Sequence, residues 1–343
     1  GDTYANRMPD PVLQQVEHFS NPGMTANDSF KPVTKYFDRI TRPEQILQSL
    51  PQAIQTMLDP AECGPACLSL CQDVQGETFD YPEEFFKERI HNIRRPRPDD
   101  FQIKQAVEKI KNSKKPIIIS GGGVFYSDAM DELGNFAIKH NIPVTQTVMG
   151  YSTMKKDHSH FVGPIGGLGG KAANNLAKET DLAICIGTKL ADFTTGSWAN
   201  FENPEFKLVS INIARHDANK HLAEAVIGDA KVTLTELSNA IGDWKSSESW
   251  HKKSQDELKS WNEYVDKESG PTNQELPSYA HAVGAIYRNS DPTDIAVTAA
   301  GGLVGEVVQV WRPKELNTHE TEWGFSCMSY EISGALGIKM ANP

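Results

Sequence analysis

Short apolar runs alternate with helical stretches through the middle of the chain, and this alternation constrains the fold more than any other feature. Five runs have the composition of β-strands, within residues 115–120, 142–147, 181–187, 207–213 and 225–229. Helical patterns lie between several of them, and a further helix is predicted over residues 230–244. Parallel strands joined by right-handed helical crossovers form a sheet that is covered on both faces. The sequence therefore predicts a Rossmann-like α/β domain over residues 100–245.

The flanking blocks repeat the same pattern less completely. Residues 43–58 have apolar side chains at helical spacing, and ACLSL after them reads as a strand. A charged, proline-bearing linker leads from this block to the domain at 100–245, and a polar surface helix is predicted within 246–270. The alternation of helices and strands resumes after that helix. The sequence predicts a helix over 278–290, a strand and glycine turn over 294–302, and a helix around 305–311. The last stretch, rich in Gly, Ala and Ser, predicts a helix packed closely on a neighbouring backbone.

Composition excludes several classes of protein. At 343 residues the chain has room for two or three domains. Its formal net charge of −11 argues against a nucleic-acid binder, because phosphate recognition depends on clustered Lys and Arg. No apolar run is long enough to span a bilayer, and five cysteines in a chain of this size fit reduced thiols in a cytoplasmic protein.

Two clusters contain residue types that can bind metals, but each has a simpler structural interpretation. Cys63, Cys67 and Cys71 have the spacing of zinc ligands on a helix, but Gly64 and Pro65 break a helix there, which favours ordinary buried thiols. His158 and His160 lack a third ligand in the sequence, so a surface loop is the favoured interpretation.

Three glycine-rich turns precede predicted helices and leave two interpretations open. They lie within residues 120–127, 163–175 and 298–306. Such turns let the anionic group of a ligand approach the backbone at the start of a helix, and Lys171 adds a modest anion preference to the second one. Equally, glycines allow two segments to pack closely without a ligand. The first turn does not match GxGxxG, so a tight strand-to-helix turn is favoured there.

Taken together, the three blocks resemble the thiamine-diphosphate-dependent enzymes of the acetolactate synthase and pyruvate decarboxylase superfamily. Within it the chain resembles in particular the trihydroxycyclohexane-1,2-dione hydrolases of myo-inositol catabolism. The resemblance spans nearly the whole chain, and the segments that carry it are GDTYANRMPDPVLQQVEH, YFDRITRPEQ, GPACLSLCQDVQ, SGGGVFYS, GKAANN, AAGGLVGEVVQVWRP and HETEWGFSCMSYEI.

The resemblance implies a division into parallel-sheet α/β domains. Residues 1–78 resemble the C-terminal half of a pyrimidine-binding domain, 79–99 a linker and 100–245 the central domain. Residues 246–274 then form a linker helix, and 275–343 the N-terminal part of a pyrophosphate-binding domain. In this frame the family's activating glutamate is expected before Gly1 and its Mg²⁺ ligands after Pro343, so we expect an inactive fragment without catalytic or metal-binding residues.

The resemblance also implies a set of cofactor-binding residues. Gly301, Gly302 and Leu303 match the turn near the diphosphate, the backbone of Ser326 and Cys327 matches the segment at the aminopyrimidine, and Met328 matches the apolar wedge beneath the bent cofactor. This sequence departs from the family pattern in having Cys71 where Pro is usual and Ser329 where Gly is expected after the methionine.

The implied reaction is the ring-opening C–C hydrolysis of a cyclic polyhydroxy dione, with thiamine diphosphate and Mg²⁺, in a homodimer or homotetramer. The central-domain loops and residues 319–323 are candidate donors to the hydroxyl-rich substrate. An acetolactate-synthase-like carboligase with a flavin in the central domain is one alternative. A non-catalytic nucleotide-binding protein is another.

Overall fold

A computed structural model of the chain describes residues 1–9, 12–13, 15 and 18–343. The five residues between these ranges belong to the first of the family-like segments, whose match there lies outside the described residues. The chain forms two compact units, Gly1–Arg95 and Pro96–Pro343. No helix among the described residues is long and apolar enough to cross a membrane.

The first unit is built on a two-stranded parallel sheet. β1 (Tyr36–Ile40) pairs with β2 (Ala66–Leu70), and the crossover between them is α1 (Ile46–Leu58). The predicted helix and the ACLSL strand are confirmed, whereas β1 was not predicted. Short 3₁₀ helices complete the unit at Ala26–Val33, Pro43–Gln45, Val74–Gly76 and Glu83–Phe86.

A buried ion network ties the start of the chain to this sheet. The fully buried carboxylate of Asp2 accepts a hydrogen bond from Arg39 Nε at 2.7 Å and another from the Ser69 hydroxyl. The same guanidinium donates to Asp28 Oδ2 at 2.7 Å. Burial raises the pKa of Asp2, but the hydrogen bonds outweigh burial and leave that pKa below its usual value. A buried carboxylate with this many donors remains charged.

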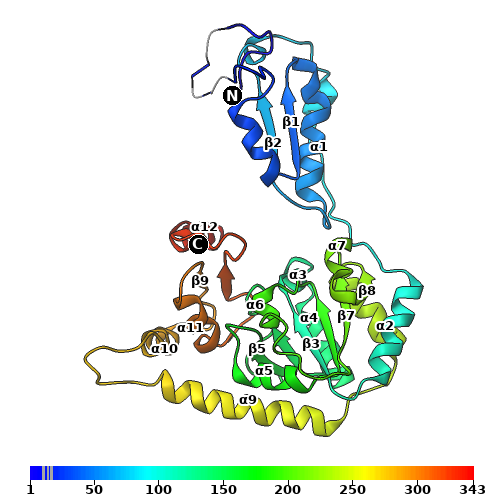
Figure 1. Ribbon diagram of the computed structural model, residues 1–343, viewed down its shortest axis with the longest axis vertical. Coiled ribbons are helices and arrows are strands. Elements are labelled where there is room, and N and C mark those ends of the chain that lie inside the picture. The colour runs from blue at the N-terminus through cyan, green and yellow to red at the C-terminus, as the bar shows by residue number, and fades with distance from the viewer. Residues whose placement is uncertain (10–11, 14, 16–17) are drawn as a thin grey trace. The chain divides into compact units, whose positions relative to one another are not determined.

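The second unit contains a six-stranded parallel sheet, which confirms the predicted α/β fold (Figure 1). Its strand order is β5-β4-β3-β6-β7-β8, so the chain builds outward from β3 on one side and then returns to add β6 on the other. The strands are β3 (Pro116–Ser120), β4 (Val144–Gln146), β5 (Phe161–Pro164), β6 (Leu182–Ile186), β7 (Lys207–Asn212) and β8 (Glu224–Ile227). Of these, only β5 was not predicted.

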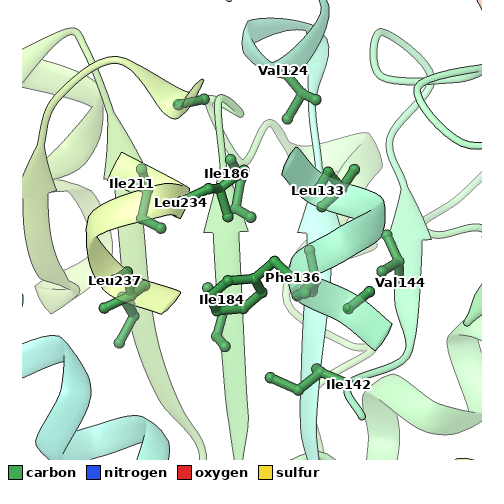
Figure 2. Close-up of a cluster of buried hydrophobic side chains, with 14 of the residues drawn as sticks. Val124, Leu133, Phe136, Ile142, Val144, Ile184, Ile186, Ile211, Leu234 and Leu237 are labelled. Carbon is green, nitrogen blue, oxygen red and sulfur yellow. The ribbon is translucent and has the colours of Figure 1, made fainter. Parts of the chain in front are cut away.

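Helices cover both faces of the sheet because successive side chains of each strand point to opposite faces. Ile118 and Ile184 belong to the core on the face of α2, α4 and α8, which Figure 2 shows as a continuous layer of aliphatic side chains around Phe136. Ile117 and Ile119 belong to the opposite core, with α5 and α9. The helices are α2 (Asp100–Asn112), α3 (Gly122–Tyr126), α4 (Met130–His140), α5 (Lys171–Glu179), α6 (Asp192–Thr195), α7 (Arg215–Ala218) with a 3₁₀ turn (Lys220–Leu222), α8 (Ala230–Ile241) and α9 (Glu248–Glu268).

The helix α9 is more than the surface helix expected from its polar sequence. It packs against α5 and β5, and its Trp250, Leu258 and Val265 are buried. Trp250 Nε1 donates a hydrogen bond to the carbonyl oxygen of Pro116 at 2.9 Å, which fixes the helix to the start of β3. The predicted helix is therefore confirmed, but one of its faces is core.

The remaining elements of the second unit are α10 (Tyr279–Asn289), β9 (Ala296–Thr298), α11 (Leu303–Val310), β10 (His319–Thr321) and α12 (Tyr330–Ala341). All but β10 were predicted. The close packing predicted for the last helix is not observed: the structure describes all of α12 and none of its residues is buried. Ile332, Leu336 and Met340 are exposed on it.

Candidate functional site

The predicted cofactor-binding residues lie on two segments that leave neighbouring parallel strands. β9 and β10 pair in parallel, with Thr298 opposite Thr321. Gly301, Gly302 and Leu303 follow β9, whereas Ser326, Cys327 and Met328 follow β10. The Ser326 hydroxyl donates to the carbonyl oxygen of Ala299 at 3.4 Å, so the two segments meet. The carboxyl edge of a parallel sheet is the usual place for a ligand in α/β proteins.

The turn after β9 has backbone facing open space. A Cβ atom added at Gly301 or Gly302 would meet no atom of the described structure within 4 Å. Gly301 has a φ of +83°, which favours glycine, and α11 begins two residues later with N–H groups that have no partner inside the helix. The alternative of a close helix–sheet contact is wrong for these two glycines. Their exposed amides suit an anionic group.

The first glycine turn is different, because its glycines are in contact with backbone. A Cβ at Gly121 would lie 2.5 Å from the carbonyl oxygen of Gly187, and one at Gly123 would lie 2.6 Å from Gly187 Cα. Gly123 N also donates to Gly187 O at 2.9 Å. The interpretation as a tight strand-to-helix turn is confirmed. This turn after β3 and the turn at Gly187 after β6 fill the gap between the carboxyl ends of the two strands. A doubly wound sheet would bind a nucleotide in that gap.

The second glycine-rich loop is a packing loop as well. A Cβ at Gly166 would collide with the carbonyl oxygen of Phe193, and one at Gly170 would lie 2.7 Å from Trp261 Nε1. Leu168 contacts the core formed by Val304 and Val308 of α11. Because α11 carries the open turn at its start, this loop holds the candidate site against the central sheet. Lys171, which adds a modest anion preference to this loop in the sequence, is exposed at the start of α5.

The loop after β10 carries Met328 on an exposed backbone. Met328 is 83% exposed, and Cys327 and Ser326 are exposed beside it. Ser329, which stands where the family pattern has Gly, has a φ of +75°. This is the left-handed conformation that a side chain disfavours, so the expected glycine has a steric reason.

Comparison with known proteins supports the family suggested by these segments. Residues 103–237 match the family of thiamine pyrophosphate enzyme central domains. A 3D-(3,5/4)-trihydroxycyclohexane-1,2-dione hydrolase of Clostridium perfringens is 40% identical over 366 aligned residues, covering 100% of this chain and 57% of the relative. Residues 103–237 are thus similar to the central domain of thiamine pyrophosphate enzymes, and the whole chain is similar to hydrolases of that name.

Relatives of the same name from Bacillus licheniformis and Geobacillus thermodenitrificans are 40% and 37% identical, again covering 100% of this chain and 57% of their own length. The chain therefore spans little more than half the length of the curated relatives it matches.

β10 also lines a small slot that the sequence pointed to only through the HETEW segment. The slot has a volume of about 20 Å³, and Tyr126, Tyr151, His319 and Glu320 are among the residues that line it. Burial lowers the pKa of His319 to about 4, so this imidazole is neutral at neutral pH. Burial raises the pKa of Glu320, although the Tyr330 hydroxyl donates to it at 3.4 Å. The neutral imidazole of His319 suits an uncharged hydroxyl or a water molecule.

The remaining candidates from the sequence behave as structural residues. Among the described residues, no group of three or more His, Cys, Asp or Glu could hold a metal ion. Cys71 is buried as expected, but Cys63 is exposed, so the expectation of buried thiols is wrong for it.

The expected surface loop at His158 and His160 is also wrong for His160. That residue is only 6% exposed; it stacks on His251 with ring centroids 4.2 Å apart, and its Nε2 forms a 3.1 Å hydrogen bond with Asn141 Oδ1. The sequence offered no signal for this contact, because His251 lies on α9, far from His160 along the chain.

Proposed function

We propose that the protein is a thiamine-diphosphate-dependent hydrolase that opens the ring of 3D-(3,5/4)-trihydroxycyclohexane-1,2-dione to give 5-deoxyglucuronate, in myo-inositol catabolism. The observation that carries the proposal is the 40% identity, over the whole chain, to the Clostridium perfringens hydrolase of that name. The open turn at Gly301 and Gly302 supports it independently, since its geometry suits a diphosphate.

We further propose the domain assignment expected from the sequence. Residues 1–78 are the C-terminal half of the pyrimidine-binding domain, followed by a linker at 79–99. Residues 100–245 are the central domain, which the match over 103–237 supports. The helix within 246–274 then leads to the N-terminal part of the pyrophosphate-binding domain at 275–343.

The cofactor proposed for the site is thiamine diphosphate with Mg²⁺. The amides that begin α11, after Gly301 and Gly302, would hold the diphosphate, and the backbone of Ser326 and Cys327 would contact the aminopyrimidine. Met328 would support the bent cofactor from below. When bound, thiamine diphosphate supplies the nucleophilic carbon and the electron sink that C–C cleavage requires. The chain's own contribution is to bind and orient, because fixed geometry lowers the entropic part of the barrier.

The substrate proposed for the enzyme is an uncharged, hydroxyl-rich ring. The Tyr151 and Thr321 hydroxyls have no hydrogen-bond partner among the described residues and are available to groups of that kind. The neutral His319 lies beside them, with its Nε2 3.4 Å from the Thr298 hydroxyl. A homodimer or homotetramer is the proposed assembly. Its proposed location is the cytoplasm, which five unpaired cysteines support.

Calorimetry with thiamine diphosphate and Mg²⁺, followed by an assay for 5-deoxyglucuronate, tests the proposal on the purified full-length protein. Saturable binding together with ring opening is expected. Absence of cofactor binding at millimolar concentration would refute the proposal. Binding accompanied by carboligation of 2-keto acids and a flavin absorbance band would instead favour the acetolactate-synthase-like alternative.

A further inference from the structure

The loop that carries Met328 is organised around a single carboxylate. Glu322 Oε1 accepts a hydrogen bond from the amide of Phe325 at 2.8 Å, and its Oε2 accepts one from the amide of Cys327 at 2.6 Å. We propose that Glu322 is a positioning residue that fixes the Met328 loop beside the Gly301–Gly302 turn. The family resemblance assigns no individual role to Glu322.

The loop has little else to hold it. Phe325 and Met328 are each 83% exposed, so apolar packing contributes little to the position of either. Ser326 and Ser329 both have left-handed backbone conformations, with φ of 52° and 75°. Left-handed residues other than glycine persist where surrounding interactions impose them. The two hydrogen bonds to the Glu322 carboxylate supply such an interaction at the centre of the loop.

Glu322 is itself held at the end of β10. Its backbone N–H donates to the carbonyl oxygen of Thr298 at 3.2 Å, which continues the pairing with β9. The neighbouring Trp323 packs edge-to-face on Phe193 at a centroid distance of 5.3 Å and also contacts the core that includes Val304 of α11. The carboxylate therefore projects from a fixed point toward a loop that has few other contacts.

Charge supports the same role. The amides of Phe325 and Cys327 lower the pKa of Glu322, so the side chain is an acceptor for both amides throughout the neutral range. Hydrogen bonds to a charged acceptor are stronger than those between neutral groups. Glutamine in this position would keep one acceptor oxygen but turn an amide NH₂ toward the second backbone donor.

The consequence for catalysis rests on the proposed function. If Met328 supports thiamine diphosphate, Glu322 determines where that support stands relative to the amides that bind the diphosphate. Loss of Glu322 would then weaken cofactor binding without removing any group that touches the reacting atoms. The ordering of the loop, in contrast, is a property of the protein without cofactor.

The test compares Glu322→Gln with Glu331→Gln, a matched control on α12 for which the described part of the chain shows no hydrogen bond or ion pair. Amide hydrogen exchange is measured over residues 324–328 without cofactor, and thiamine diphosphate affinity is then measured by calorimetry. For Glu322→Gln we expect amide exchange about tenfold faster and thiamine diphosphate affinity about tenfold weaker. These changes are smaller than the full contribution of charged hydrogen bonds, because solvent screens the exposed carboxylate. The control variant should match the wild type in both, and circular dichroism checks that both variants fold.

Each outcome separates the two proposals. Unchanged exchange in Glu322→Gln would overturn the positioning role whether or not the cofactor binds. Faster exchange with unchanged affinity would show that the order of the loop does not affect cofactor binding. This outcome would overturn the role of Glu322 in positioning Met328 for the cofactor. Absence of thiamine diphosphate binding by the wild type would refute the proposed function, while the exchange result would still test the loop.

Discussion

Two glycine turns of similar sequence should respond to the same substitution in opposite ways. Gly302 has helical backbone angles of φ −65° and ψ −26°, and nothing in the described structure lies within 4 Å of a Cβ built on it. Gly123 would place its Cβ 2.6 Å from Gly187 Cα, on backbone that cannot rotate away. Alanine at each position therefore adds the same methyl group to an open site and to a filled one.

The expected magnitudes follow from these surroundings. In Gly302→Ala, reduced entropy of the unfolded chain contributes about 0.4–1 kcal/mol, which the poorer alanine N-cap offsets by a few tenths or more. The free energy of unfolding should therefore stay within about 0.5 kcal/mol of wild type. In Gly123→Ala the two turns must separate, and overpacking of this kind costs about 1–3 kcal/mol.

Urea denaturation and calorimetry with thiamine diphosphate measure the two effects separately. Gly302→Ala should fold normally but bind the cofactor at least about tenfold more weakly, equivalent to about 1.4 kcal/mol, because the methyl group occupies space proposed for the diphosphate. Gly123→Ala should unfold at lower urea while its folded fraction binds the cofactor normally. A destabilised Gly302→Ala would refute the open-turn geometry, and unchanged affinity would refute its assignment to the diphosphate.

Three further changes test other parts of the structure. Ser329→Gly should raise the free energy of unfolding by up to about 1 kcal/mol in urea denaturation, because it removes left-handed strain; a loss of stability would contradict the conformation described. Trp250→Phe should lower that free energy by about 1–3 kcal/mol, because the carbonyl oxygen of Pro116 loses its buried donor, whereas the exposed Tyr264→Phe on the same helix should change it little. Burial, followed by the like charge of His251, lowers the pKa of His160 to about 4, below its unfolded value of about 6.5. The stability that neutral His160 contributes is therefore complete above pH 6.5 and is lost as pH falls toward 4. His160→Gln should flatten the dependence of stability on pH in that window, and an unchanged pH profile would contradict the assignment.

The sequence predicted the central sheet well where strands are continuous apolar runs. Ile117, Ile118 and Ile119 are recognisable as a strand buried on both faces because no polar residue interrupts them. β5 was not predicted because its four residues include Gly163 and Pro164, which are poor strand formers. β10 consists of His319, Glu320 and Thr321, whose burial comes from neighbours rather than from hydrophobicity.

Sequence reasoning was less informative about the site, because glycine patterns do not reveal their neighbours. The turns at Gly121 and at Gly301 both follow a strand and precede a helix. Only the position of Gly187, far along the chain, shows that the first is filled. Glu322 also escaped detection as an individual residue, since a carboxylate that accepts amides three and five residues later has no distinctive sequence pattern.

The contact between Gly121, Gly123 and Gly187 has a consequence for how variation in this protein should be interpreted. Purifying selection at these positions would arise from steric exclusion alone, and would be as strict as selection on a residue that touches substrate. A reader of natural variants who equated invariance with catalysis would place an active site in the middle of the central sheet, where two turns of the chain leave no room for one.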